Sequence, residues 1–150
     1  MKRVMILVFA LVMSCPLMGF AQTDADREAV RQAALDYVEG VYEVDATRIE
    51  RSVHPDLAKR GFYIKKGETT YSFSPMTFAE LVNLAKTYNK DGRVPKDAPK
   101  EVTVLDVLDQ TASVKVVAVW GVDYMHLAKY DGRWKAVVVG SYERGDRAVT

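Results

Sequence analysis

The chain has 150 residues, which is enough for one ordinary domain. Its 21 basic and 20 acidic residues nearly balance, which excludes the strongly basic composition of proteins that bind nucleic acid or anionic membranes. A single cysteine excludes a disulfide framework within the chain.

The N-terminal segment predicts a secretory signal sequence. Lys2 and Arg3 form a basic start, residues 4–13 are almost all apolar, and the small residues Gly19 and Ala21 precede a polar stretch. We therefore expect cleavage after Ala21, so that residues 1–21 are a signal peptide and residues 22–150 are an exported domain, periplasmic or secreted.

Two other interpretations of this segment stay open. Cys15 follows Ser14 much as in a bacterial lipoprotein signal, which would leave the domain anchored by a lipid. An uncleaved anchor is the second, although the apolar run is shorter than the about 20 residues that span a bilayer, and no membrane span is expected after processing. Removing Lys2 and Arg3 from the 21 basic residues leaves 19 against 20 acidic ones, so the mature domain is close to neutral.

Two helices are predicted next. Residues 23–42 carry an apolar stripe at three- and four-residue spacing. A shorter helix should run from about residue 45 to His54 and stop there, because the residue before Pro55 is pushed out of the helical region. Residues 56–60 are expected to form one more helical turn. The stripe of the first helix consists of Val30, Ala33, Ala34, Tyr37, Val38, Val41 and Tyr42.

The middle of the chain predicts a short hairpin and a third helix. Residues 62–64 and 70–73 have the composition of strands, and Pro75 is expected to end the second one. Thr77 and Glu80 have the spacing of a capping box, which marks the start of the helix.

The last third predicts an antiparallel sheet. After a loop, four consecutive segments are rich in Val, Tyr and Trp, and Asp131-Gly132 is a strong signal for a tight hairpin turn. Helices followed by such a meander indicate an α+β domain. The four segments are residues 101–109, 111–121, 122–130 and 133–142.

Strand alternation divides the side chains of this sheet between two faces. Taking lysines as markers of the outward face, we expect an aromatic inner face. The outward face would then keep many apolar residues, which predicts that a second copy of the chain covers it in a homodimer. The expected inner residues are Trp120, Tyr124, His126, Tyr130 and Trp134; the outward ones are Val117, Val119, Met125, Leu127, Val137 and Val139.

Three residues are candidates for acid–base chemistry. His126, among the inner aromatics, is either a pocket base or a packed histidine satisfied by a neighbour. His54 is either a residue at the pocket rim or a helix-end cap. Asp123 should point away from His126 on a regular strand, as a solvated edge residue, unless a bulge near Gly121 turns it inward.

Aromatic residues are the candidates for ligand binding. Tyr37, Trp120, Tyr124 and Trp134, with His126, would stack on a flat ligand, although aromatics at such spacing also build cores. The sequence has no phosphate-binding glycine loop and no His/Cys cluster with metal spacing, so neither a cofactor nor a metal is expected.

Three motifs carry a resemblance to a known family. They lie at residues 53–60 (Val-His-Pro-Asp-Leu-Ala-Lys-Arg), 74–78 (Ser-Pro-Met-Thr-Phe) and 120–135, the last hairpin. With the order of elements, they resemble the nuclear-transport-factor-2-like superfamily and its putative lumazine-binding family. The resemblance implies a cystatin-like roll: a cone-shaped, curved antiparallel sheet wrapped around the N-terminal helix, often dimeric through the outer sheet face.

These observations support three hypotheses. The first is an exported protein that binds a small, partly aromatic ligand in the cone. The second is an enzyme that needs no cofactor, of the isomerase or lyase type, with His126 or His54 as the base. The third is a structural homodimer without a ligand.

Overall fold

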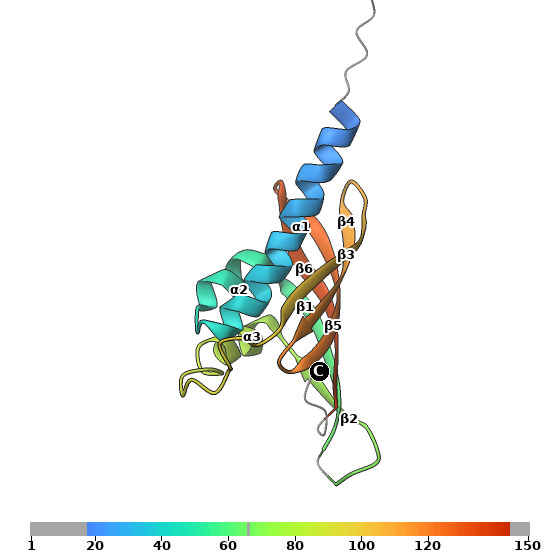
Figure 1. The fold of residues 1–150 in the computed structure, drawn as a ribbon. Helices are drawn as coiled ribbons and strands as arrows, with labels where there is room; N and C mark the ends of the chain where they lie inside the picture. The colour runs from blue at the N-terminus through green and yellow to red at the C-terminus, as the bar shows by residue number, and fades with distance from the viewer. Residues whose placement is uncertain (1–17, 66, 145–150) are drawn as a thin grey trace, which may run out of the picture.

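The structure is a computed structural model that describes residues 18–65 and 67–144, so most of the predicted signal sequence lies outside the described residues. It begins with helix α1 (Met18–Tyr42), the long helix of Figure 1, which ends where the apolar stripe predicted. The stripe is buried against the sheet. Its members include Val30, Ala34, Tyr37, Val38 and Val41, all nearly inaccessible to solvent.

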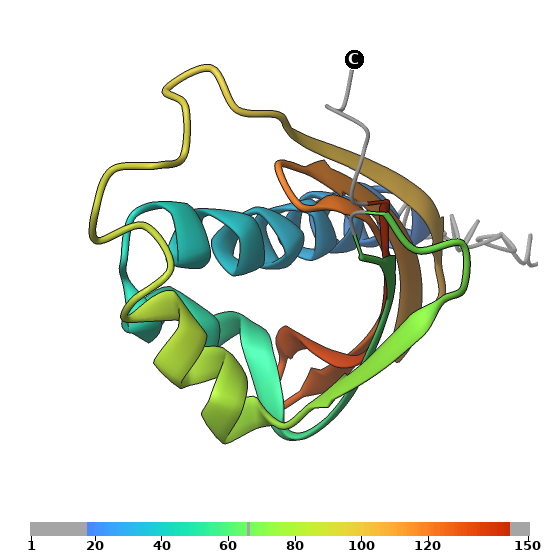
Figure 2. The same cartoon turned by 90° about the horizontal axis from the view of Figure 1, so that it is seen from below.

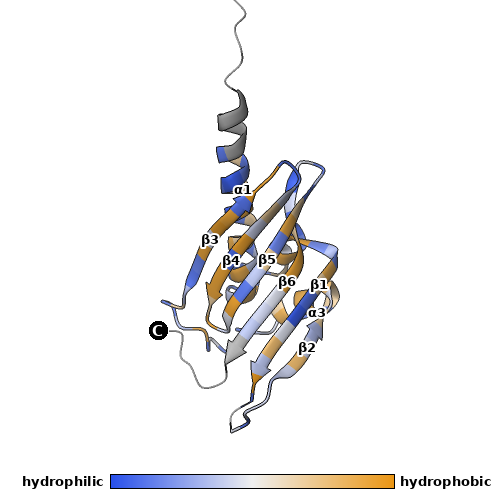
Figure 3. Cartoon of the chain, turned by 90° about the vertical axis from the view of Figure 1, so that its right-hand side faces the viewer, coloured by the Kyte–Doolittle hydropathy of each residue, from blue (hydrophilic) through white to orange (hydrophobic). Residues whose placement is uncertain are grey.

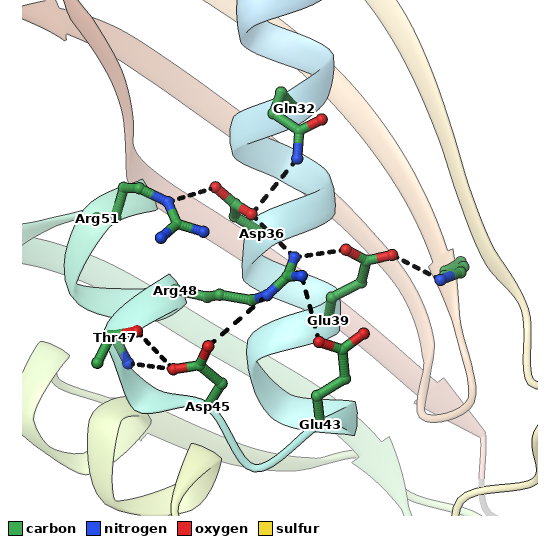
Figure 4. A network of polar contacts seen from close by, with 9 residues as sticks. Gln32, Asp36, Glu39, Glu43, Asp45, Thr47, Arg48 and Arg51 are labelled. Carbon is green, nitrogen blue, oxygen red and sulfur yellow. Dashed lines mark hydrogen bonds and ion pairs between the residues drawn. The ribbon is translucent and has the colours of Figure 1, made fainter.

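Helix α2 (Ala46–Ser52) folds back against α1 and is fastened to it by ion pairs. Arg48 Nη1 lies 3.0 Å from Asp36 Oδ1 and 2.5 Å from Glu39 Oε2, and Arg51 Nε lies 2.8 Å from Asp36 Oδ2 (Figure 4). Close contact between the helices also needs Gly40, because a Cβ there would come within 3.0 Å of Ile49 Cδ1.

Strand β1 (Val53–Ile64) occupies the segment for which one more helical turn was predicted. That prediction is wrong over residues 56–60. The pairing of β1 with β6 shifts register between Val53 and Ala58, so the residues around Pro55 form an irregularity within the strand. Beyond it, Ala58–Ile64 pair in parallel with the end of β6, and these strand contacts outweigh the local turn signal.

Strand β2 (Ser72–Met76) runs through Pro75, which was expected to end it. Proline is tolerated there because β2 is an edge strand, where a missing N–H removes no bond to an outer neighbour. Helix α3 (Phe78–Ala85) then begins with the predicted capping box: the Thr77 side chain accepts from the N–H of Glu80, whose carboxylate accepts from the N–H of Thr77.

The antiparallel meander is confirmed. Its turn at Asp131-Gly132 has φ angles of 48° and 74°, the left-handed conformation that the dipeptide predicted. It forms strands β3 (Lys100–Val107), β4 (Thr111–Ala118), β5 (Gly121–Tyr130) and β6 (Arg133–Arg144).

All six strands form one curved sheet in the order β2-β1-β6-β5-β4-β3, antiparallel except for the β1–β6 pair. The three helices lie on its concave side, and α1 crosses the sheet (Figures 1 and 2). Figure 3 shows the opposite, outer side of the sheet. The predicted α+β class and curved sheet are therefore confirmed, and the sheet is not closed into a barrel. Within the described residues, no helix has the length and apolar character to cross a membrane.

Candidate functional site

A pocket of about 390 Å³ lies inside the cone. Its residues come from α1, α3 and the segment that follows α3, from β1, β2 and β6, and from the turn between β4 and β5. The walls are mostly apolar and aromatic. They include Val41, Met76, Leu81, Leu84, Tyr88 and Trp120.

One end of the pocket is polar, and we call its three residues, Tyr37, Lys59 and Ser141, the pocket floor. The Lys59 ammonium donates to Tyr37 Oη at 2.8 Å and to Ser141 Oγ. All three side chains are almost fully buried, yet all three line the pocket. The Lys59 ammonium therefore lies at the pocket wall, held between two hydroxyl groups.

Asp123 lies behind the floor as the counter-ion of Lys59. Its Oδ2 accepts from Tyr37 Oη at 2.8 Å and Trp120 Nε1 at 3.2 Å, and lies 3.7 Å from Lys59 Nζ. The residue is fully buried and does not line the pocket. Its Oδ1 has no hydrogen-bond partner among the described residues.

The Tyr37 hydroxyl links the two charges. Burial raises the pKa of Tyr37 well above its ordinary value, and the charge of Asp123 and the hydrogen bond to it raise the pKa further. The phenol therefore stays protonated over the physiological range, accepting from Lys59 while donating to Asp123. The neutral Tyr37 hydroxyl thus bridges Lys59 and Asp123, whose charged atoms Nζ and Oδ2 lie 3.7 Å apart.

Trp120 forms the aromatic wall above this network. Its ring meets Tyr37, Tyr42 and Tyr88 edge-to-face, with centroids 5.6–6.1 Å apart. Tyr42 is fixed in turn, since its hydroxyl donates to Pro99 O and accepts from the N–H of Val119. Ring contacts and hydrogen bonds thus position Trp120 and Tyr42 in this wall.

Comparison with known proteins agrees with this architecture. Residues 25–142 match the family model described as "Putative lumazine-binding". The chain belongs to the putative lumazine-binding family. The resemblance inferred from the sequence motifs is thus confirmed, and the match spans both the helices and the meander.

Solved structures similar to this family member share its fold. An NTF2-like protein with a cystatin-like fold from Novosphingobium aromaticivorans is 17% identical, with a TM-score of 0.56 and coverage of 90% of this chain and 94% of that one. An NTF2-like protein from Shewanella baltica is 15% identical (TM-score 0.54, coverage 78% and 92%).

A putative scytalone dehydratase, also from Novosphingobium aromaticivorans, is 13% identical (TM-score 0.54, coverage 81% and 85%). At such identities the likeness concerns the fold alone. No curated protein matches the chain.

Two of the predicted ligand-binding residues, Tyr37 and Trp120, line the pocket, and the others lie elsewhere. Tyr124 and His126 lie on the outer face, where Tyr124 is 55% exposed and His126 Nδ1 lies 3.0 Å from Ser113 Oγ. Trp134 faces inward as predicted but is buried in the core, with its indole N–H donated to Asp26.

The two remaining candidates for acid–base chemistry also lie differently from expectation. His54 stacks on Tyr130, with ring centroids 4.1 Å apart, and accepts from the N–H of Asp56. Neither it nor His126 is among the described residues that line the pocket. Asp123 faces inward and is buried. Regular alternation, with the lysines taken as outward-facing, had predicted that it faces outward.

The face assignment of β5 was wrong because Lys129 is not an outward marker. Its ammonium pairs with Asp26 of α1 at 2.8 Å, so the lysine points under the helix. Ala118 pairs with Gly121 across the turn, which keeps Asp123, Met125 and Leu127 on the inner face.

A second face assignment failed in β6. Between the pairs His126–Val138 and Leu127–Ala136 the register shifts, so Val137 is an extra residue in β6. Such a bulge reverses the alternation, which leaves Val138 exposed and brings Val139 and Ser141 inward.

The sequence patterns did not indicate Lys59 and Ser141 as site residues. Lys59 lies in the segment predicted as a helical turn, and a lysine there is most simply a solvated residue. Ser141 follows the bulge in β6, which the sequence pattern does not reveal. A usable signal for Lys59 was its place in the first family motif, at residues 53–60.

Proposed function

We propose that this protein binds a small, flat, mostly apolar molecule whose polar edge lies against the pocket floor. The supporting observation is the pocket itself, in which apolar and aromatic walls converge on one buried, hydrogen-bonding end. This combination is typical of small-molecule sites, and its volume of about 390 Å³ suits a ligand of two or three rings.

The family description suggests lumazine as the first ligand to test. Lumazine is a fused two-ring heterocycle whose flat faces can pack against Trp120 and Tyr88. Its carbonyl oxygens are hydrogen-bond acceptors, and the hydroxyl of Ser141, which lines the pocket, can donate to them. The chemistry of the floor and the shape of the walls thus favour the same class of ligand.

The test is direct titration with lumazine, followed by native mass spectrometry and by tryptophan fluorescence, since Trp120 lines the pocket. Leu84→Trp should fill the pocket and abolish binding. Leu105→Trp is the matched control, because Leu105 is 50% exposed and does not line the pocket. Equal binding by both variants would place the ligand elsewhere, and a folded wild-type protein that retains no heterocycle would refute the proposal.

Acid–base catalysis receives less support. Neither histidine is among the described residues that line the pocket. Asp123 is fully buried behind Tyr37 and Trp120 and forms an ion pair with Lys59. A candidate base needs to reach the proton it removes, which none of these three side chains does here. We therefore favour binding over turnover.

We also propose that the protein acts as a homodimer through the outer sheet face. Cross-strand neighbours form an apolar row there, and Phe62 and Phe73 are 45% and 54% exposed. Light scattering should give a dimer, and Phe73→Glu should weaken it while Leu105→Glu does not. A monomer at micromolar concentration would refute this assembly. The full row is Phe73, Phe62, Tyr142, Val122 and Val117.

Export is the third part of the proposal, and it depends on the signal-like segment at residues 1–21. Expression of the full chain in a bacterial host, followed by cell fractionation, should recover a product that begins at Gln22. A product beginning at Cys15 would instead show lipid processing, and an uncleaved product in the cytoplasm would refute export.

A further inference from the structure

We propose that Gly61 is the platform on which the ring system of the ligand lies, because its missing side chain leaves the backbone of β1 bare inside the pocket. This inference rests on the proposed binding function. It adds the orientation of the ligand, with one ring face against the sheet, and the residue that makes room for it.

Gly61 lies on the side of β1 that faces the pocket. Side chains alternate along a strand, so Lys59 and Tyr63 point to the same side as the position of Gly61, and all three residues line the pocket. Because Gly61 has no side chain, it lines the pocket with its backbone. A larger residue at this position would extend into the space where a ligand binds.

The conformation of β1 does not require a glycine here. The φ angle of Gly61 lies outside the left-handed region that favours glycine. Gly61 pairs in regular register with Ser74 of β2 and Ser141 of β6, and the irregularity in β1 lies earlier, between Val53 and Ala58. Gly61 therefore does not mark a bulge.

Packing within the described structure does not require it either. A Cβ added to Gly61 would meet Ser74 O at 3.4 Å and Ser74 Cβ at 3.8 Å, which are ordinary van der Waals contacts. Gly40 differs in this respect, because a Cβ there would come within 3.0 Å of Ile49 Cδ1. Glycine weakens a strand, and the reasons that remain for it are a tight bend or the close approach of a ligand.

The backbone at Gly61 offers a flat surface to such a ligand. Since β1 lies between β2 and β6, its N–H and C=O groups point toward these neighbours within the sheet. A ring above Gly61 therefore touches the faces of peptide groups, to which it can lie parallel. Helix α3 packs against β1, and its Leu81 and Leu84 line the pocket, so the other ring face meets apolar side chains.

This orientation agrees with the polar end of the pocket. Ser141 is the partner of Gly61 on the neighbouring strand, and both residues line the pocket. A ring that lies on Gly61 thus has one edge beside the Ser141 hydroxyl, which can donate to a carbonyl oxygen on that edge.

Two substitutions place carbon atoms where the ring is expected to lie. The probes are lumazine and alloxazine, a three-ring molecule with the same dione ring. The dissociation constant of each probe that binds should rise several-fold in Gly61→Ala and at least about tenfold in Gly61→Val, the range for overfilling a packed site. Gly140→Ala is the matched control and should bind as the wild type does. Gly140 also lies within a strand, a Cβ there would meet Tyr124 O at 3.9 Å, and it is not among the described residues that line the pocket.

Thermal melts of the free proteins separate a ligand contact from a bend that needs glycine. Gly61→Ala should melt at the wild-type temperature or higher, because alanine restricts the unfolded chain more than glycine and its Cβ fits here. A melting temperature clearly below those of the wild type and Gly140→Ala would assign the glycine to the curvature of the sheet and overturn the inference.

Nuclear magnetic resonance of the wild-type protein tests the same contact without a substitution. The chain has nine glycines, so their amide signals are few, and either probe should shift the signal of Gly61 and leave that of Gly140 in place. If a probe binds while the Gly61 signal does not move, or binds Gly61→Val as tightly as the wild type, the inference is refuted and the binding function stands. If the wild type binds neither probe, both proposals fail.

Discussion

Replacing Lys59 with methionine keeps the length of the side chain and removes its charge. In the folded protein this leaves the Asp123 carboxylate, which is fully buried, without a cation. It also leaves the oxygens of Tyr37 and Ser141 without their donor. Lys59→Met therefore tests whether the floor is held together by charge.

The expected loss is about 3–5 kcal/mol, the usual cost of removing one partner of a buried ion pair. We expect a loss in the upper half of this range, because the side chains of Lys59 and Asp123 are only 10% and 0% exposed. Adding Asp123→Asn removes the unpaired charge and keeps an oxygen that accepts from Tyr37 and Trp120. The double variant should therefore lie within about 1–2 kcal/mol of the wild type.

Urea unfolding followed by tryptophan fluorescence measures both variants. With a slope of about 2 kcal/mol per molar urea, the single variant should unfold at a concentration about 2 M lower than the wild type. Asp123→Asn alone completes the cycle and gives the coupling energy. A loss under about 1 kcal/mol for Lys59→Met, or a double variant no more stable than it, would refute the idea that the two charges depend on each other.

Three further predictions concern single residues. Because the pKa of Tyr37 is raised, its stabilising effect is present below the ordinary phenol pKa and lost as pH rises; alkaline titration by absorbance should show a late-ionising tyrosine that Tyr37→Phe removes. Burial alone would raise the pKa of Asp36, but Arg51, Gln32 and Arg48 together outweigh it and the pKa is lowered. Asp36→Asn should thus cost about 1–2 kcal/mol at pH 7, with the difference closing in urea titrations below about pH 4. Thr77→Ala should cost about 1 kcal/mol in a thermal melt, and an unchanged melting temperature would contradict the capping role.

The sequence predicted the features of the fold that depend on local chemistry. The stripe on α1, the capping box at Thr77 and the turn at Asp131-Gly132 each follow from neighbours within a few residues, and the structure confirms each one. The segment after Pro55 was misread because its conformation depends on pairing with β6, which lies more than 70 residues away in the chain. Local signals contain no information about that partner.

The candidate site was harder to predict for a related reason. Side chains alternate between the two faces of a strand, so the face of each residue is inferred from one residue whose face is taken as known. If that residue is assigned to the wrong face, every other residue of the strand is assigned wrongly too. In β5 that residue was Lys129, whose partner Asp26 is on α1. In β6 the cause was the bulge at Val137, which adds one residue and reverses the alternation beyond it. Both effects arise only once α1 and the sheet are packed together.

These inversions change the chemistry attributed to the protein. The inner face predicted from the sequence centred on His126 and suggested either a site where aromatic residues stack on a ligand or a catalytic site. The inner face in the structure instead has Asp123 paired with Lys59 through the neutral hydroxyl of Tyr37. In such a buried pair each charge offsets the cost of burying the other. The two histidines on which the acid–base hypothesis depended are not among the described residues that line the pocket, whereas Lys59 is one of them and Asp123 lies directly behind it.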